Sequence, residues 1–272
     1  MKKILLPLEG AHYPGELLEF VCTIHPKTPV QLTAALVTQS DYTSLLAAGE
    51  LPIYLQEPCF RNWNRIVRHH GRRVERICDD FGIKCKINFD QDNFTLQRLW
   101  NESRYADLML LNSRHFFRQP DAVPSNAWMR DMLHRSECPL LLLPDKTNLP
   151  GELILAYDGS ANSVFAIKEF ASLFPEFCRI STTLVYVNDD PEVSIPEEKS
   201  IRELCALHFK KFRTLKLGMK TEGFYNAWVG MMQNPWLITG SLSCSGLSPL
   251  FSGNLSAELI HQYRVPVFIA RR

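Results

Sequence analysis

The chain has 272 residues, enough for one large domain or two ordinary ones, and its 46% hydrophobic and 22% charged residues are typical of a globular protein. Its formal net charge of +1 argues against electrostatic capture of nucleic acid or of an anionic membrane. No apolar run reaches the ~20 residues that span a bilayer. The run after Lys2 and Lys3 is too short for a signal peptide, so we expect a cytoplasmic protein.

Eight cysteines are spread along the chain, without a C-x-x-C pair and without the Cys/His spacing of a zinc finger. Most of them stand in apolar segments, as reduced, buried thiols of cytosolic proteins do. We therefore predict neither disulfides nor a metal site. Cys244 stands in a loop and is the one candidate for reactivity.

The first half of the chain alternates short apolar runs with amphipathic segments, and residues 38–56 fit neither pattern. The predicted strands are 3–10, 30–37, 85–89, 106–111 and 139–143, and the predicted helices are one that buries Leu17, Leu18 and Val21, then 58–82, 94–104 and 128–135.

The helix at 58–82 has the clearest pattern. Apolar residues recur at steps of three and four, which predicts one buried face, and Gly82 ends the helix. The predicted buried face consists of Phe60, Trp63, Val67, His70, Val74, Ile77 and Phe81. The arginines between 61 and 76 fall mostly on the other side, which indicates a solvated face, with an anionic partner as the alternative.

The same pattern starts again after a polar, proline-containing linker at 145–150. Residues 153–159 repeat 4–10, residues 235–241 repeat 107–113, and residues 261–270 repeat 134–143. The remaining predicted elements are helices at 163–174, 196–212 and 223–232 and strands at 181–187 and 214–219. This repeat predicts two domains of ordinary size, at 1–145 and 151–272.

Strands that alternate with helices indicate parallel sheets covered on both faces. The predicted fold class is therefore α/β, with two tandem doubly wound parallel five-stranded sheets of Rossmann-like type. Ligands of such sheets bind at the carboxyl ends of the strands. The turn at Asp158 and the loop after Gly240 are both expected at that end of the second sheet.

A loop of small residues follows the predicted strand at 236–239. It has glycines at 240, 246 and 253, and Asn254 stands where the next helix should begin. Glycines let a backbone approach a ligand, and the free N–H groups of a helix start attract negative charge, so this loop can form an anion site. A βα connection without a ligand is the alternative, since such loops are common.

Three segments together resemble the universal stress protein family. They are Ile-Leu-Ala-Tyr-Asp-Gly-Ser at 154–160, Leu-Val-Tyr-Val-Asn-Asp at 184–189, and Leu-Ile-Thr-Gly-Ser at 237–241 followed by Val-Pro-Val-Phe-Ile at 265–269. The resemblance covers nearly the whole chain as two tandem domains. It implies the adenine-nucleotide alpha hydrolase-like fold and ATP or AMP as the ligand.

The resemblance also implies a set of site residues. Nucleotide-binding members of the family hold phosphate and ribose with the pattern G-x2-G-x9-G-[S/T], which falls here on Gly240, Ser243, Gly253 and Asn254. It implies further that Asp158 is associated with the nucleotide and that the backbone of Val187 meets the adenine.

The second half departs from this family pattern. Ser243 replaces the middle glycine, which costs on the order of 1 kcal/mol if that residue needs a positive φ. Asn254 lacks the hydroxyl, but its amide still donates to an oxyanion. Cys244 stands where the family often has a basic residue. No Lys or Arg lies between Lys220 and Arg264, so this loop leaves a triphosphate largely unneutralised.

The first half departs further, because residues 83–150 contain no glycine. Asn112 and His115 take the glycine positions, and Glu9 takes the acid position. Large side chains there exclude backbone capture of phosphate, so we predict that this half has lost the site. The arginines at 114 and 118 are interpreted as part of a surface loop.

Enzyme motifs are absent from the sequence: it has neither a P-loop nor a nucleophile elbow, and Ser160 or Ser163 is interpreted as a helix cap. The favoured function is a non-enzymatic universal stress protein with a stress-response role, which binds a nucleotide, if any, in its second half. A ligand-free protein that acts through protein–protein contacts is the alternative, and a nucleotide hydrolase ranks third.

The last strand of each half is apolar enough to be a buried edge. Since paired domains of the family commonly associate through these strands, we predict that 139–143 and 266–270 pair within one chain as a pseudo-dimer. A homodimer of two chains is left open.

Overall fold

The computed structural model describes residues 1–9, 13–37, 56–88, 96–113, 132, 134–188, 190, 192–218, 228–240 and 265–272. For residues 9, 36–37, 56–64 and 96–97 it describes the backbone alone. The chain divides into two compact units, unit 1 (Met1–Leu140) and unit 2 (Leu141–Arg272). The linker expected at 145–150 falls just after this division, within unit 2.

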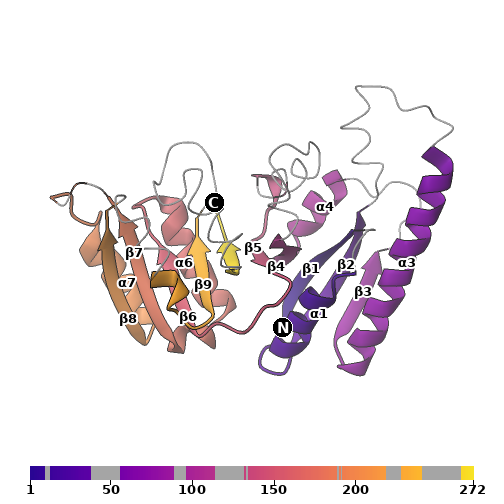
Figure 1. Cartoon of the computed structure of the whole chain (residues 1–272), viewed down its shortest axis with the longest axis horizontal. Coiled ribbons are helices and arrows are strands. Elements are labelled where there is room, and N and C mark those ends of the chain that lie inside the picture. Colours follow the sequence, from indigo (N-terminus) through magenta and orange to yellow (C-terminus); the bar gives the residue numbers. More distant parts are fainter. Residues whose placement is uncertain are drawn as a thin grey trace. The chain divides into compact units, whose positions relative to one another are not determined.

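Unit 1 consists of parallel strands joined by helices (Figure 1). In chain order its elements are β1 (Lys2–Glu9), α1 (Gly15–Ile24), β2 (Val30–Val37), α3 (Gln56–Asp80), β3 (Lys84–Asn88), α4 (Leu96–Ser103), β4 (Leu108–Asn112) and β5 (Leu140–Leu143), inside which the unit ends. The strand order is β3-β2-β1-β4-β5. The first strand thus lies in the middle, with its two neighbours parallel to it.

Unit 2 repeats this plan. Its elements are β6 (Glu152–Ala156), α6 (Ala161–Leu173), a 3-10 helix (Phe177–Arg179), β7 (Ser181–Val187), α7 (Glu198–His208), β8 (Lys211–Leu217), helical residues 228–230, β9 (Pro235–Thr239) and β10 (Val267–Ile269). The strand order is β10-β9-β6-β7-β8, again with the first strand in the middle and parallel to both neighbours. The repeat seen in the sequence therefore corresponds to the same topology in both units.

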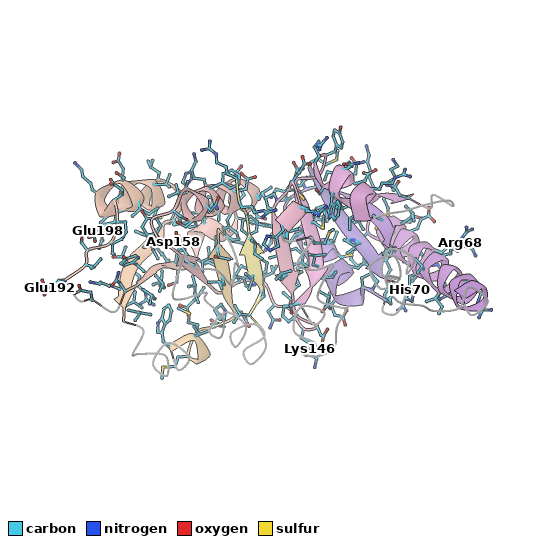
Figure 2. The ribbon with its side chains drawn as sticks, turned by 90° about the horizontal axis from the view of Figure 1, so that it is seen from above. Arg68, His70, Lys146, Asp158, Glu192 and Glu198 are labelled. Atoms are coloured by element: carbon cyan, nitrogen blue, oxygen red, sulfur yellow. The ribbon has the colours of Figure 1, made fainter. Side chains whose placement is uncertain are left out.

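Each sheet is doubly wound. In unit 2 the chain steps from β6 to β7 and β8 in one direction, and then returns to β9 and β10 on the other side of β6. Right-handed crossovers therefore put α6 and α7 on one face and the helical residues 228–230 on the other, as Figure 2 shows. The predicted fold class is confirmed.

Most element bounds follow the sequence pattern, and β2 and β7 begin and end where predicted. The helix predicted at 196–212 is wrong at its end, because α7 stops at His208 and β8 already begins at Lys211. The side chain of Phe209 is 2% exposed, and the N–H of Lys210 donates to the carbonyl of Cys178 at 2.9 Å. Burial of Phe209 and this long-range bond turn the chain out of the helix before the amphipathic pattern is exhausted.

The long helix α3 buries the face that the sequence predicts, as far as its side chains are described. Val67 is 2% exposed and Val74 is fully buried, whereas the arginines from Arg65 to Arg76 are exposed. The prediction fails for Phe81, which is 57% exposed because it lies beyond the end of the helix. The side chains of Phe60 and Trp63 lie outside the described part.

The core of unit 2 contains a cluster of aromatic rings from α6, the 3-10 helix, β9 and β10. The indole of Trp236 is fully buried and meets the ring of Phe177 edge-on, with ring centroids 5.7 Å apart. Phe268 meets Phe170 at 5.3 Å and Phe174 at 6.2 Å. These contacts hold β9 and β10 against α6, and so they position the residues that follow both strands.

Candidate functional site at the carboxyl edge of unit 2

Three of the predicted site residues lie at the ends of three adjacent strands. Asp158 follows β6, Val187 ends β7 on one side of it, and Gly240 follows β9 on the other side. The parallel registers of β6 with β7 and with β9 bring all three to the carboxyl edge of the sheet. The other predicted residues, Ser243, Gly253 and Asn254, and also Cys244, lie outside the described residues.

Asp158 shapes the turn that leads into α6. Its Oδ1 accepts a hydrogen bond from the N–H of Ser160 at 2.9 Å, and the side chain is half-buried. Ser160 is the N-cap of α6, since its Oγ accepts from the N–H of Ser163 at 3.2 Å. The hydroxyl of Ser163 donates back to the Ser160 carbonyl at 2.9 Å. The interpretation of Ser160 as a helix cap is confirmed.

Replacing Ser160 with alanine is expected to destabilise unit 2 by about 1 kcal/mol, because an N–H at the start of α6 then loses its acceptor. Urea unfolding followed by circular dichroism measures this loss. Ser160→Asp is the matched control, since aspartate also caps helices, and it should unfold close to the parent protein. Equal stability of Ser160→Ala and the parent would contradict the capping role.

Gly159 adopts a left-handed backbone, with φ of 81°, directly after the aspartate. A Cβ at this position would lie 2.8 Å from Cβ of Pro196, so the space above the turn is already filled. The hydroxyl of Tyr157 donates to the carbonyl of the same proline at 2.9 Å. The segment before α7 therefore crosses the carboxyl end of β6 and is fixed there.

Gly240 approaches the first turn of α6 at very short range. A Cβ at this position would collide with the carbonyl carbon of Asn162, and would lie 2.5 Å from the nitrogen of Ser163 and 2.6 Å from the oxygen of Asn162. These atoms are all backbone and cannot rotate away. Glycine is thus required here for strand-to-helix packing, whether or not a ligand binds.

Val187 presents its backbone and not its side chain. The side chain is 7% exposed, and the N–H of the next residue, Asn188, donates to the carbonyl of Leu217 at 2.8 Å. The amide of Asn188 donates to the hydroxyl of Tyr186 at 3.1 Å, and its Oδ1 accepts from the N–H of Asp190. Any contact of Val187 with a ligand would therefore pass through main-chain atoms, as the family resemblance implies.

Arg271 is a residue of this edge that the sequence analysis missed. It follows β10 and is half-buried, and burial lowers the pKa of its guanidinium. Among the described residues no carboxylate pairs with it. The N–H of the next residue, Arg272, donates to Oδ1 of Asn162 at 3.2 Å, which ties this segment to the first turn of α6. The strand order supplies the signal, because β10 lies beside β9.

Charge is distributed unevenly along the carboxyl edge. The segment between β7 and α7 carries Asp190, Glu192 and Glu197, and α7 begins with Glu198; Figure 2 labels Glu192 and Glu198 together with Asp158. The opposite end of the edge, after β10, carries two arginines. An anionic group is therefore favoured near β9 and β10 and disfavoured near β7.

The corresponding edge of unit 1 is built differently. Asn112 ends β4 at the position that Gly240 occupies in the repeat, and Glu9 ends β1. Because a Cβ at Gly240 collides with the first turn of α6, the helix that follows β6, a β4 that ends in asparagine cannot approach the corresponding helix α1 in the same way. The helix α1 also starts without a side-chain cap at Pro14. The residues at 114–131, which include Arg114, His115 and Arg118, lie outside the described part.

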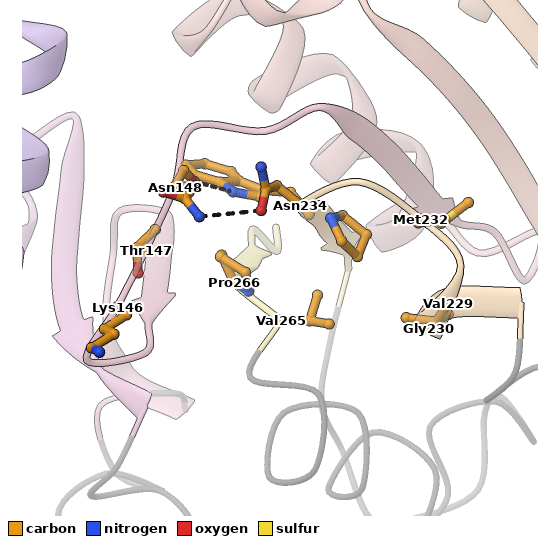
Figure 3. Close-up of a pocket in the computed structure, with 11 residues that line it drawn as sticks. Lys146, Thr147, Asn148, Val229, Gly230, Met232, Asn234, Val265 and Pro266 are labelled. Carbon is orange, nitrogen blue, oxygen red and sulfur yellow. Dashed lines mark hydrogen bonds between the residues drawn. The ribbon is translucent and has the colours of Figure 1, made fainter.

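A pocket of about 280 Å³ lies at the opposite, amino edge of unit 2 (Figure 3). Its walls are more polar than apolar, and their polar groups bind one another: Nδ2 of Asn148 donates to Oδ1 of Asn234 at 3.2 Å, and Nε1 of Trp236 donates to the carbonyl of Asn148 at 3.2 Å. These polar groups use one another as hydrogen-bond partners, so they do not indicate which ligand the pocket would bind. The pocket is separate from the predicted site.

Comparison with known proteins supports the fold. A crystal structure of a universal stress protein from Archaeoglobus fulgidus DSM 4304 is similar, with a TM-score of 0.70 and 16% sequence identity over 100% of this chain and 96% of that one. No protein-family model and no curated protein sequence matches the chain. The similarity therefore establishes a fold like that of a universal stress protein.

The described residues show no cluster of three or more His, Cys, Asp or Glu side chains that could hold a metal ion. Within the same residues, no helix has the length and apolar character needed to cross a membrane.

Proposed function

We propose that the chain is a non-enzymatic protein of the universal stress type, with a role in stress response, and that it binds an adenine nucleotide such as ATP or AMP through unit 2 alone. The observation that carries this proposal is the edge where Asp158, Val187 and Gly240 lie at the ends of adjacent strands, with Arg271 just after the next strand, β10. The similar fold of the Archaeoglobus protein supports the universal stress type.

The charge along the edge supports one orientation of the nucleotide. The adenine would lie near the backbone of Val187, on the acidic side, and the ribose near Asp158. The phosphate would lie beside Gly240 and Arg271, where a half-buried guanidinium has no described carboxylate partner. The single guanidinium of Arg271 neutralises a monophosphate better than a triphosphate, so we expect AMP to bind at least as tightly as ATP.

The proposal assigns no nucleophilic role to Ser160, for a local reason. A nucleophilic serine needs a free hydroxyl and an adjacent base. The hydroxyl of Ser160 is engaged at the start of α6, and its neighbours in the turn are Asp158 and Ser163, without a histidine. For a non-enzymatic protein, incubation with ATP is expected to release no phosphate above the buffer rate, and a faster release would contradict the proposal.

A ligand-free protein that acts through protein–protein contacts is the second candidate. Asp158 and Gly240 favour it, because one caps a turn and the other packs against α6, so neither needs a ligand to explain it. Pairing of the two final strands within one chain, as a pseudo-dimer, stays a prediction in both cases.

Thermal melting of the full chain with AMP, ADP and ATP tests the nucleotide proposal. Binding to the native state stabilises it, by about 2.7 kcal/mol at about 100 times Kd, so the melting temperature should rise. Arg271→Ala should reduce the rise, whereas Arg272→Ala, which removes an exposed side chain, should keep it. No rise at millimolar nucleotide would favour the ligand-free candidate, and a rise retained in Gly253→Val would place the site elsewhere.

A further inference from the structure

Two cysteines of unit 1 meet at the end of α3. Gly82 has a φ of 66°, its N–H donates to the carbonyl of Asp79 at 3.1 Å, and the N–H of Ile83 donates to the carbonyl of Cys78 at 2.8 Å. This is a Schellman motif, which reverses the chain tightly. The chain then enters β3 beside α3 (Figure 1), and this turn brings the thiols of Cys78 and Cys85 close enough to interact.

The two thiols have different environments. Cys78 is fully buried, whereas Cys85 is only half-buried. Their hydrogen bond lowers the pKa of Cys85 and raises the pKa of Cys78, because the Cys78 thiol donates and the Cys85 sulfur accepts. Cys85 is therefore the sulfur that a reagent reaches and that ionises first.

Other described thiols lack this combination. Burial raises the pKa of Cys138 to about 12, of Cys178 to about 11 and of Cys205 to about 12, and each of the three is buried. Cys22 is also buried, and its pKa is raised by burial first and then by the neighbouring Cys78.

The position of β3 allows the sulfurs to approach further. It is the outermost strand in the order β3-β2-β1-β4-β5, and β2 is its one paired neighbour. Lys84 and Lys86, on either side of Cys85, are exposed, and so is Gly82 in the turn. An edge strand with exposed flanks can shift toward α3 at lower cost than a central strand.

We propose that Cys85 and Cys78 form a modification site that takes a low-molecular-weight disulfide as its co-substrate and closes to an intramolecular disulfide. The Cys85 thiolate attacks one sulfur of the disulfide, which forms a mixed disulfide and releases one thiolate. Cys78 then gives up its proton and attacks the Cys85 sulfur, which releases the second thiolate. In total two protein thiols become one disulfide, and the reagent is reduced to two thiols. The cysteine pattern of the sequence had predicted no disulfide.

The test uses the reduced full chain, oxidised glutathione and a tryptic digest under non-reducing conditions. Trypsin cuts after Arg76, Lys84 and Lys86, so the two cysteines fall in different peptides and a disulfide links them. The linked pair, lighter by two hydrogen atoms, is the expected product, and dithiothreitol should restore the two free peptides. Free peptides at every glutathione concentration that modifies other cysteines would overturn the proposal.

Two variants separate the roles of the sulfurs. Cys78→Ser should accumulate glutathione on Cys85, because the resolving thiol is gone, and Cys85→Ser should leave Cys78 unmodified. Cys178→Ser, a buried thiol without a thiol partner among the described residues, is the matched control and should give the same linked pair as the parent chain. Glutathione on Cys78 in Cys85→Ser would contradict the order in which Cys85 attacks first and Cys78 resolves. The linked pair in the parent chain tests the disulfide itself, whether or not a variant folds.

Discussion

Replacing Gly240 with alanine is expected to lower the free energy of unfolding of unit 2 by about 2–3 kcal/mol in the absence of any ligand. The added methyl group would lie 2.5 Å from the nitrogen of Ser163 and 2.6 Å from the oxygen of Asn162, both in the first turn of α6. Backbone atoms cannot move aside by a change of rotamer, so the end of β9 or the start of α6 must shift. Urea unfolding followed by circular dichroism measures the loss.

Gly15→Ala is the matched control, because it is the same substitution at a helix start. Its methyl group would lie 3.4 Å from the ring of Tyr13, an ordinary contact, and alanine is the better helix former. This variant should be as stable as the parent or slightly more stable. If Gly240→Ala were equally stable, the close approach to α6 would be excluded and the glycine would be free for a ligand.

The same glycine shows why a sequence motif alone cannot define the site. A glycine after a strand is required both for close backbone approach to a phosphate and for close packing of strand on helix. The sequence pattern at Gly240 is identical in the two cases. The described structure accounts for this glycine by packing alone. Variants of Arg271 and Gly253 in binding experiments therefore distinguish a ligand site from mere packing better than any change at Gly240 does.

The fold was largely predictable because it depends on local periodicity. Buried parallel strands such as β2 and β7 are short runs rich in apolar and β-branched residues, and their bounds follow from the sequence. The boundary between α7 and β8 could not be predicted, because the helix ends at a contact between Lys210 and Cys178, which are distant in the sequence. Periodicity describes a single segment, so it cannot include such a contact.

The site was predictable only in part, for the same reason. Asp158, Val187 and Gly240 were found because each lies at the end of a recognisable strand or within two residues of it. Arg271 was missed because only the strand order shows that the residues after β10 adjoin those after β9. The pair of Cys78 and Cys85 was missed because its contact depends on the left-handed turn at Gly82.

Replacing Trp236 with alanine is expected to destabilise unit 2 by about 3–5 kcal/mol, the largest effect of any single change argued for this chain. The indole is fully buried and lies edge-on to the rings of Phe174 and Phe177, so its removal leaves a cavity among rigid aromatic groups that cannot close it. The melting temperature of unit 2 should fall by roughly 10–20 °C.

Two controls connect this loss to packing in the core. Trp236→Phe keeps a ring in the cluster and should recover a large part of the stability. Trp228→Ala removes the same side chain from a half-buried position and should cost less than Trp236→Ala. Since Trp236 lies in β9, which ends at the residue before Gly240, loss of the indole should also loosen the strand end that the candidate site requires. Equal destabilisation by Trp236→Ala and Trp228→Ala would show that the aromatic cluster does not hold β9 in place.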